Sequence, residues 1–220
     1  MKIENEYESY IQYVSNFYPK SSMVSSSNVH KYKNIIHYSF KTIYLLDLYY
    51  HYQGTSIKSK SLLMELKMSF VRFLYVLPIN DYFFIETILR AISENVLRVV
   101  YNIIYPDKGI EEIKKLSYRN LWQNGIKKSN VFSENNTTLS NINNIYRQKS
   151  DTIHSSRYNY ENQIDYMIDL MIEDSQMSLK QLESDIMHLY QFILHEMKIF
   201  LDVNEQDLTL QQINVLKMVT

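Results

Sequence analysis

Apolar residues recur at helical spacing along most of the chain. The first such segment runs from Glu4 to Phe17, and Pro19 ends it. A second helix is predicted from about Asn28 to Gly54. A third is predicted from Ile57 to Leu77, because Pro78 cannot continue the hydrogen-bond ladder of a helix interior.

The clearest helix begins after Asn80 or Asp81, either of which can cap it, and keeps helical spacing until Pro106. Polar residues from Lys127 to Ser140 predict the longest loop of the chain. Other helical segments are predicted at about Ile110–Leu116, Tyr118–Ile126, Leu139–His154, Gln163–Glu173 and Leu179–Leu201, followed by a short amphipathic tail.

This sequence of helical segments predicts an all-α fold. The composition agrees, because 3 Gly and 3 Pro in 220 residues supply too few turn positions for a many-stranded sandwich or barrel. A loose division places N-terminal accessory helices in residues 1–78 and a helical bundle in residues 79–220. No change of composition marks that boundary, so one continuous domain stays open as the alternative.

Charge and hydropathy narrow the class of protein. The formal net charge of −1 excludes a uniformly basic nucleic-acid coat, although local patches stay open. Without cysteine the chain has no disulfide framework. No apolar stretch reaches the length of about 18 residues needed to cross a membrane, and the N-terminus is acidic rather than signal-like. We therefore expect a cytoplasmic protein that is not inserted in a membrane.

Several common catalytic motifs are missing from the sequence. It has no phosphate-binding glycine loop, no dinucleotide fingerprint, no His-Glu-x-x-His and no Gly-x-Ser-x-Gly. The 6 His form no compact cluster with acidic residues, and His188 and His195 are expected to be structural or solvent-facing. We therefore expect neither a cofactor nor a metal.

The segment Ile-Tyr-Arg-Gln-Lys-Ser-Asp-Thr-Ile-His-Ser-Ser at positions 145–156 stands out. It resembles the Arg…His signature of the HEPN superfamily, in which four to six residues separate the two. These all-helical proteins include many metal-independent RNases of toxin–antitoxin, abortive-infection and CRISPR-associated systems. Here Arg147 and His154 have the longest of those spacings. The similarity covers about Asn80–Leu201, and Glu94 and Arg98 match an acid and an arginine on the neighbouring helix of some members.

The resemblance implies an antiparallel helical bundle of HEPN type with an additional N-terminal helical segment. It implies a homodimer that cleaves RNA in host defence or as a toxin, with an antitoxin or an activating partner as a candidate regulator. Arg147 would clamp the scissile phosphate and His154 would transfer a proton, as base or as acid. The supporting residues would be Glu94, Arg98, Ser150, Asp151, Ser155 and Tyr158.

Helix geometry indicates why two copies would be needed. Seven residues are close to two turns, so Arg147 and His154 share one face and lie about 10 Å apart along the axis. An arginine leans toward the N-terminus of its helix, and here away from His154. Two copies related by a two-fold axis would place four functional groups around one cleft.

Structural interpretations stay open beside the catalytic one. Arg147 and Asp151 could form an i,i+4 ion pair while His154 caps a helix end, and Glu94 with Arg98 could be another such pair. Basic residues near the motif could contact RNA phosphates, but solvated positions are the more common role; they are Lys127, Lys128, Lys149 and Arg157. The alternative function is a non-catalytic helical module that binds RNA or a partner protein.

Overall fold

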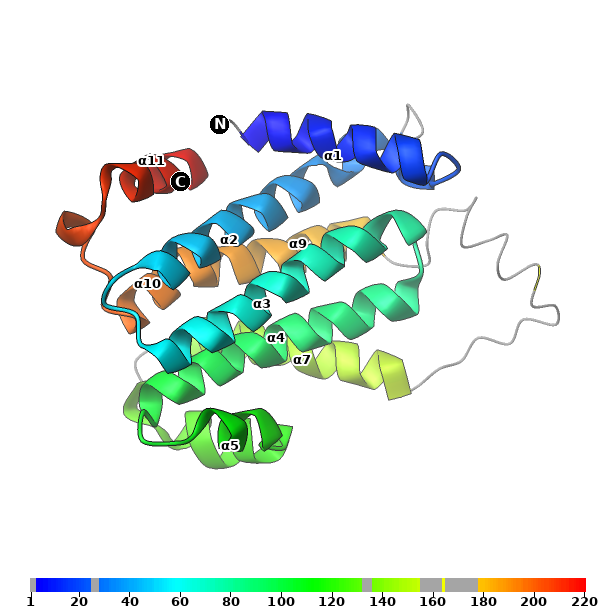
Figure 1. Cartoon of the computed structure of the whole chain (residues 1–220). Coiled ribbons are helices and arrows are strands. Elements are labelled where there is room, and N and C mark those ends of the chain that lie inside the picture. The colour runs from blue at the N-terminus through cyan, green and yellow to red at the C-terminus, as the bar shows by residue number, and fades with distance from the viewer. Residues whose placement is uncertain (1–2, 25–27, 132–135, 155–163, 165–177) are drawn as a thin grey trace.

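The computed structural model describes residues 3–24, 28–131, 136–154, 164 and 178–220 (Figure 1). Every regular element in these ranges is a helix, so the predicted all-α class is confirmed for the part of the chain described. None of the helices described is both long enough and apolar enough to cross a lipid bilayer.

The principal helices have these bounds: α1 Ile3–Phe17, α2 Lys33–His51, α3 Ile57–Val76, α4 Tyr82–Ile104, α5 Ile110–Lys115, α7 Asn136–His154, α9 Leu179–Gln191, α10 Met197–Phe200 and α11 Leu210–Val219. Shorter helical turns are η1 Ser22–Val24, η2 Val29–Tyr32, η3 Leu77–Ile79, η4 Arg119–Gly125, η5 Ile126–Lys128, η6 Phe192–Glu196 and η7 Glu205–Asp207. Among them, η4 and η6 are π-helical.

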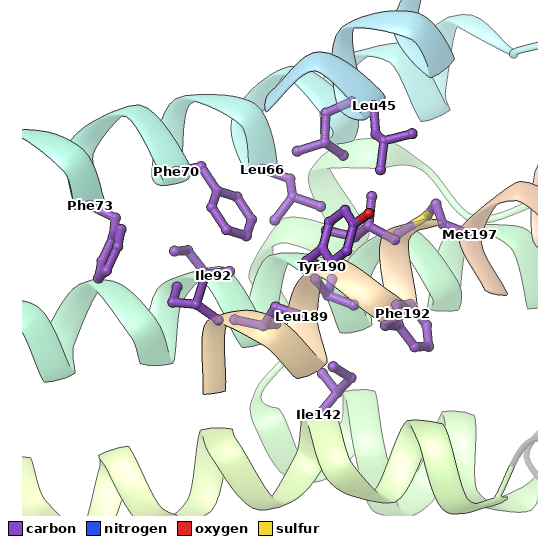
Figure 2. Packing of buried hydrophobic residues seen from close by; sticks show 14 of the residues in the cluster. Leu45, Leu66, Phe70, Phe73, Ile92, Ile142, Leu189, Tyr190, Phe192 and Met197 are labelled. Carbon is purple, nitrogen blue, oxygen red and sulfur yellow. The ribbon is translucent and has the colours of Figure 1, made fainter. Parts of the chain in front are cut away.

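The long helices lie side by side as a bundle, with α1 along one side and α5 at one end (Figure 1). Helix α4 packs between α3 and α7, while α2 packs against α3 and α9. Figure 2 shows side chains from different helices meeting in the core, among them Leu45, Phe70, Ile92, Ile142 and Leu189. This buried cluster continues from α1 to α11 and holds α7 in place.

Local sequence signals set the start of α4. The Asp81 carboxylate accepts a hydrogen bond from the Phe84 amide at 3.2 Å, which makes Asp81 the cap. Asn80 instead adopts a left-handed conformation with φ 60°, which asparagine tolerates better than most residues. Together with Pro78 it reverses the chain between α3 and α4.

The last predicted helix, Leu179–Leu201, is interrupted. Helix α9 ends at Gln191, the π turn η6 follows, and α10 completes the segment. A π turn displaces the backbone from regular i→i−4 pairing. The buried Tyr49 hydroxyl of α2 donates to the Ile193 carbonyl of this turn at 2.9 Å. This hydrogen bond holds the irregular turn against α2.

The predicted loop over 127–140 is wrong at both ends. The turn η5 extends to Lys128, and α7 already begins at Asn136. Ile126 and Leu139 are buried, and they anchor these two elements although polar residues adjoin them. The helix predicted over 163–173 lies outside the described residues apart from Ile164. The division at Pro78 stays a prediction, and α3 packs directly on α4, which follows it.

Candidate functional site

A single continuous helix, α7, carries both residues of the sequence motif. Its inward face contributes buried Ile142, Ile145 and Tyr146 to the bundle. Its outward stripe contains Asn144, Arg147 and Asp151, all exposed. His154 is the last residue of α7, and its backbone position continues the helical register of Arg147, because seven residues make nearly two turns.

Arg147 borders an open groove of about 760 Å³ between α7 and the segment from Tyr118 to Lys127. The groove is lined by Tyr118, Trp122, Gln123, Lys127, Ser140, Asn143, Asn144 and Arg147. Two of these side chains are cationic and none is a carboxylate. The groove therefore combines positive charge, amides and aromatic rings at the predicted catalytic arginine.

An aromatic stack forms one wall of this groove. The rings of Tyr118 and Tyr146 are parallel to within 8°, with centroids 3.9 Å apart. Arg90 of α4 lies beyond Tyr146, with its guanidinium carbon 5.2 Å from the ring centroid, and donates to the Tyr146 hydroxyl at 3.1 Å. Tyr118 is the member of this stack that reaches the groove.

The Tyr118 hydroxyl donates to Oδ1 of Asn143. Burial raises the pKa of Tyr118 to about 12, the neighbouring Tyr146 adds to the rise, and Arg147 opposes it. The phenol is therefore protonated at neutral pH and serves as a donor. Because Oδ1 of Asn143 accepts this bond, the amide N–H groups are what Asn143 can donate to the groove.

The π turn η4 follows Tyr118 on the side of the groove that faces α7, and Gly125 ends this turn. A Cβ at this position would lie 2.4 Å from Cε2 of Tyr101 and 3.1 Å from the Asn120 carbonyl oxygen. Only glycine therefore allows this close approach to α4. The tight contact fixes the junction between η4, from which Trp122 reaches the groove, and η5, which carries Lys127.

Of the other residues predicted to act near the motif, the structure describes Ser150 and Asp151. The Ser150 hydroxyl donates to the Tyr146 carbonyl at 2.8 Å, a bond within α7. Asp151 is exposed, and among the described residues no ion pair links it to Arg147. Ser155, Arg157 and Tyr158 lie outside the described residues.

Glu94 and Arg98 are placed in a different groove, between α3 and α4. Their side chains form an ion pair at 2.6 Å, and Arg98 also donates to the Lys114 carbonyl at 3.2 Å. No residue lines both this groove and the groove of Arg147. The structure therefore does not bring this pair to the motif, and the ion-pair interpretation is confirmed.

Lys149 corrects the sequence-based interpretation of the basic residues. It was expected to be solvated or to contact substrate, yet its side chain is only 6% exposed. Its Nζ lies 2.9 Å from Glu86 of α4 and 2.8 Å from Asp185 of α9. We call these residues the buried triad. Glu86 and Asp185 lie far from Lys149 in sequence, so no local pattern indicated the buried triad.

The other two described lysines near the motif, Lys127 and Lys128, are exposed, and of these two only Lys127 borders the groove.

Within the described part of the chain, no group of three or more His, Asp or Glu side chains is placed to hold a metal ion.

Comparison with known proteins adds no relative. No protein-family model matches the chain, and no curated protein and no solved structure matches it either. Function therefore has to be inferred from the chemistry of the groove and of α7.

Proposed function

We propose that this chain is a metal-independent endoribonuclease of HEPN type, active as a homodimer in host defence against phage or as a toxin. One observation supports this proposal above the others. Exposed Arg147 borders a groove without carboxylates, on the same helix and in the same register as His154. A planar guanidinium is suited to a phosphate, and an imidazole exchanges protons near neutral pH.

In the proposed reaction the 2′-hydroxyl of the substrate loses its proton and attacks the adjacent phosphorus. The bond from phosphorus to the 5′ oxygen breaks, and that oxygen gains a proton. The products are a 2′,3′-cyclic phosphate and a 5′-hydroxyl. Arg147 stabilises the negative charge that grows on the phosphoryl oxygens, and His154 handles one of the two proton transfers.

The proposed homodimer rests on the spacing of Arg147 and His154 along α7. Two turns separate Arg147 from His154 by about 10 Å of helix axis, and arginine side chains lean toward the helix N-terminus. A second copy facing the first would supply the complementary pair at one cleft. We therefore expect the active species to have twice the mass of one chain.

The test is cleavage of short labelled transcripts in excess chelator, with analysis of the product ends. Arg147→Ala and His154→Ala should each reduce the rate at least 100-fold, as expected for loss of a group that stabilises or protonates the transition state. Matched controls are Arg72→Ala on α3 and His195→Ala in η6, because both are exposed and neither borders the groove. Full activity in the Arg147 and His154 variants would refute the proposal.

A specific observation also supports the rival function, a non-catalytic module that binds RNA or a protein. The groove contains cations, amides and aromatic rings without any contribution from His154. Binding of RNA by a dimer that leaves the RNA intact would favour this rival. Growth arrest on expression, relieved by His154→Ala, would favour the toxic enzyme instead.

A further inference from the structure

We infer that the groove beside Arg147 is a subsite for an unpaired nucleotide of single-stranded RNA. In it, the base contacts the aromatic wall and the amides, while Lys127 and Arg147 neutralise the phosphates on either side. This inference rests on the proposed function in one respect, that the polymer is RNA. It adds the residues that would select an unpaired base over a paired one.

The charge of the lining identifies an anionic ligand. Lys127 and Arg147 are exposed and come from opposite walls, η5 and α7. No carboxylate lines the groove with them. In the groove between α3 and α4, by contrast, Glu94 lies 2.6 Å from Arg98, and that cation is neutralised within the protein. In the groove of Arg147, by comparison, no lining carboxylate is present to neutralise Lys127 and Arg147.

The aromatic wall identifies a flat ligand. Tyr146 covers one face of Tyr118 at 3.9 Å, so Tyr118 offers the groove its other face or its edge. Trp122 borders the same groove from η4. Stacking of bases on aromatic rings is a common way for proteins to hold single strands.

The amides identify a ligand with both donors and acceptors on one edge. Gln123 and Asn144 are exposed in the groove, and Asn143 is oriented by the bond from Tyr118. Amide side chains pair with the edges of bases through one donor and one acceptor. A base within a duplex is stacked on both faces and paired along its Watson–Crick edge, so an unpaired base fits this combination better.

The groove is also built before any ligand arrives. Gly125 packs closely against Tyr101 of α4, and Tyr118 stacks on Tyr146, which in turn contacts Arg90 of α4. Its volume of about 760 Å³ lies within the usual range for small-molecule sites, roughly 300–1,000 Å³. Rigid walls reduce the ordering cost of binding.

Trp122 provides a local probe, because it is the only tryptophan among the 220 residues. The experiment titrates the full-length protein with a 2′-O-methyl single strand of mixed sequence, whose blocked 2′ oxygen prevents cleavage. Tryptophan emission reports the groove, and the anisotropy of a label on the oligonucleotide reports binding anywhere. We expect saturable quenching of Trp122 with the same midpoint as the anisotropy change, and at least ten-fold weaker binding of the matching duplex.

Paired variants localise the contact. Lys127→Ala should weaken binding about ten-fold at low salt. It should also reduce the slope of the logarithm of affinity against the logarithm of salt concentration by the amount expected for about one phosphate contact. Its control is Lys128→Ala, an exposed lysine at the next position that does not border the groove. Asn144→Ala should weaken binding several-fold, with exposed Gln148→Ala on the same helix as its control.

The outcomes separate this inference from the proposed function. Binding without quenching, or equal loss in the Lys127 and Lys128 variants, would overturn the subsite even if the protein cleaves RNA. Equal affinity for single strand and duplex would overturn it as well, and so would the absence of any binding. Quenching and variant effects as expected, in a protein that never cleaves RNA, would support the subsite and refute the nuclease.

Discussion

Two cations two positions apart on α7 have opposite environments. Lys149 points into the bundle, where the carboxylates of Glu86 and Asp185 hold its ammonium at 2.9 and 2.8 Å. Arg147 lies on the outward stripe and borders a groove that no carboxylate lines. The first arrangement joins three helices of the fold, whereas the second presents charge to a ligand. Whether a basic residue near a motif stabilises the fold or binds a ligand therefore depends on the partners of its side chain in the folded protein.

The largest effect is expected from Lys149→Met. It keeps the volume of the side chain but leaves two buried carboxylates without their cation. We expect the free energy of unfolding in urea to fall by about 3–5 kcal/mol. Arg147→Ala should change it by no more than about 0.5 kcal/mol, as usual for an exposed position.

A combined variant checks that the loss comes from charge. Adding Glu86→Gln and Asp185→Asn to Lys149→Met removes the whole buried triad. It should recover much of the lost stability, because uncharged groups cost less to bury than unpaired ions. Equal stability of the Lys149→Met variant and the unmodified protein would contradict the structural role assigned to Lys149.

A smaller effect is expected from Gly125→Ala. The added Cβ would meet the Tyr101 ring at 2.4 Å, so either Tyr101 or η4 has to move. We expect a loss of about 1–3 kcal/mol in the free energy of unfolding and a changed emission spectrum of Trp122. Gly109→Ala is the control, because a Cβ there meets nothing within 4 Å. An unshifted Trp122 spectrum would show that the wall does not depend on Gly125.

The pH dependence of stability should reveal the excess negative charge of the buried triad. Burial raises the pKa of Glu86, although Lys149 opposes the rise. The folded state then holds a proton that the unfolded state has already released, so stability falls as pH rises through the folded pKa. Glu86→Gln should remove this slope and raise the stability at alkaline pH, where the buried carboxylate would otherwise be ionised. Asp151→Asn, at an exposed position, should keep the slope. If the Glu86→Gln variant kept the same slope of stability against pH, the slope would arise from other titratable groups.

The smallest effect on stability is expected from Lys127→Ala. Its side chain is exposed, so we expect a change within about 0.5 kcal/mol in urea unfolding. The same substitution should weaken the binding of single strands, as described for the groove. A large loss of stability would show that Lys127 belongs with Lys149 in holding the fold.

The sequence predicted most helices because local signals mark their ends. Ile57 begins α3 as predicted, and Asp81 caps α4. The predicted helix Leu139–His154 corresponds to α7, which begins three residues earlier, at Asn136. The buried triad could not be predicted, because it depends on residues from three helices that are distant in sequence. The groove was missed for a related reason, since the segment from Tyr118 to Lys127 meets α7 only after folding.

The hydrogen bond from Tyr49 to Ile193 in the π turn η6 limits how the bundle can move. The buried Tyr49 hydroxyl lies 2.9 Å from the Ile193 carbonyl and 3.4 Å from the Leu194 carbonyl, so two neighbouring acceptors of the irregular turn hold it against α2. Movement of η6 away from α2 would leave this hydroxyl buried without an acceptor, which costs about 1–3 kcal/mol. A conformational change on ligand binding would keep this contact if α2 and η6 moved together.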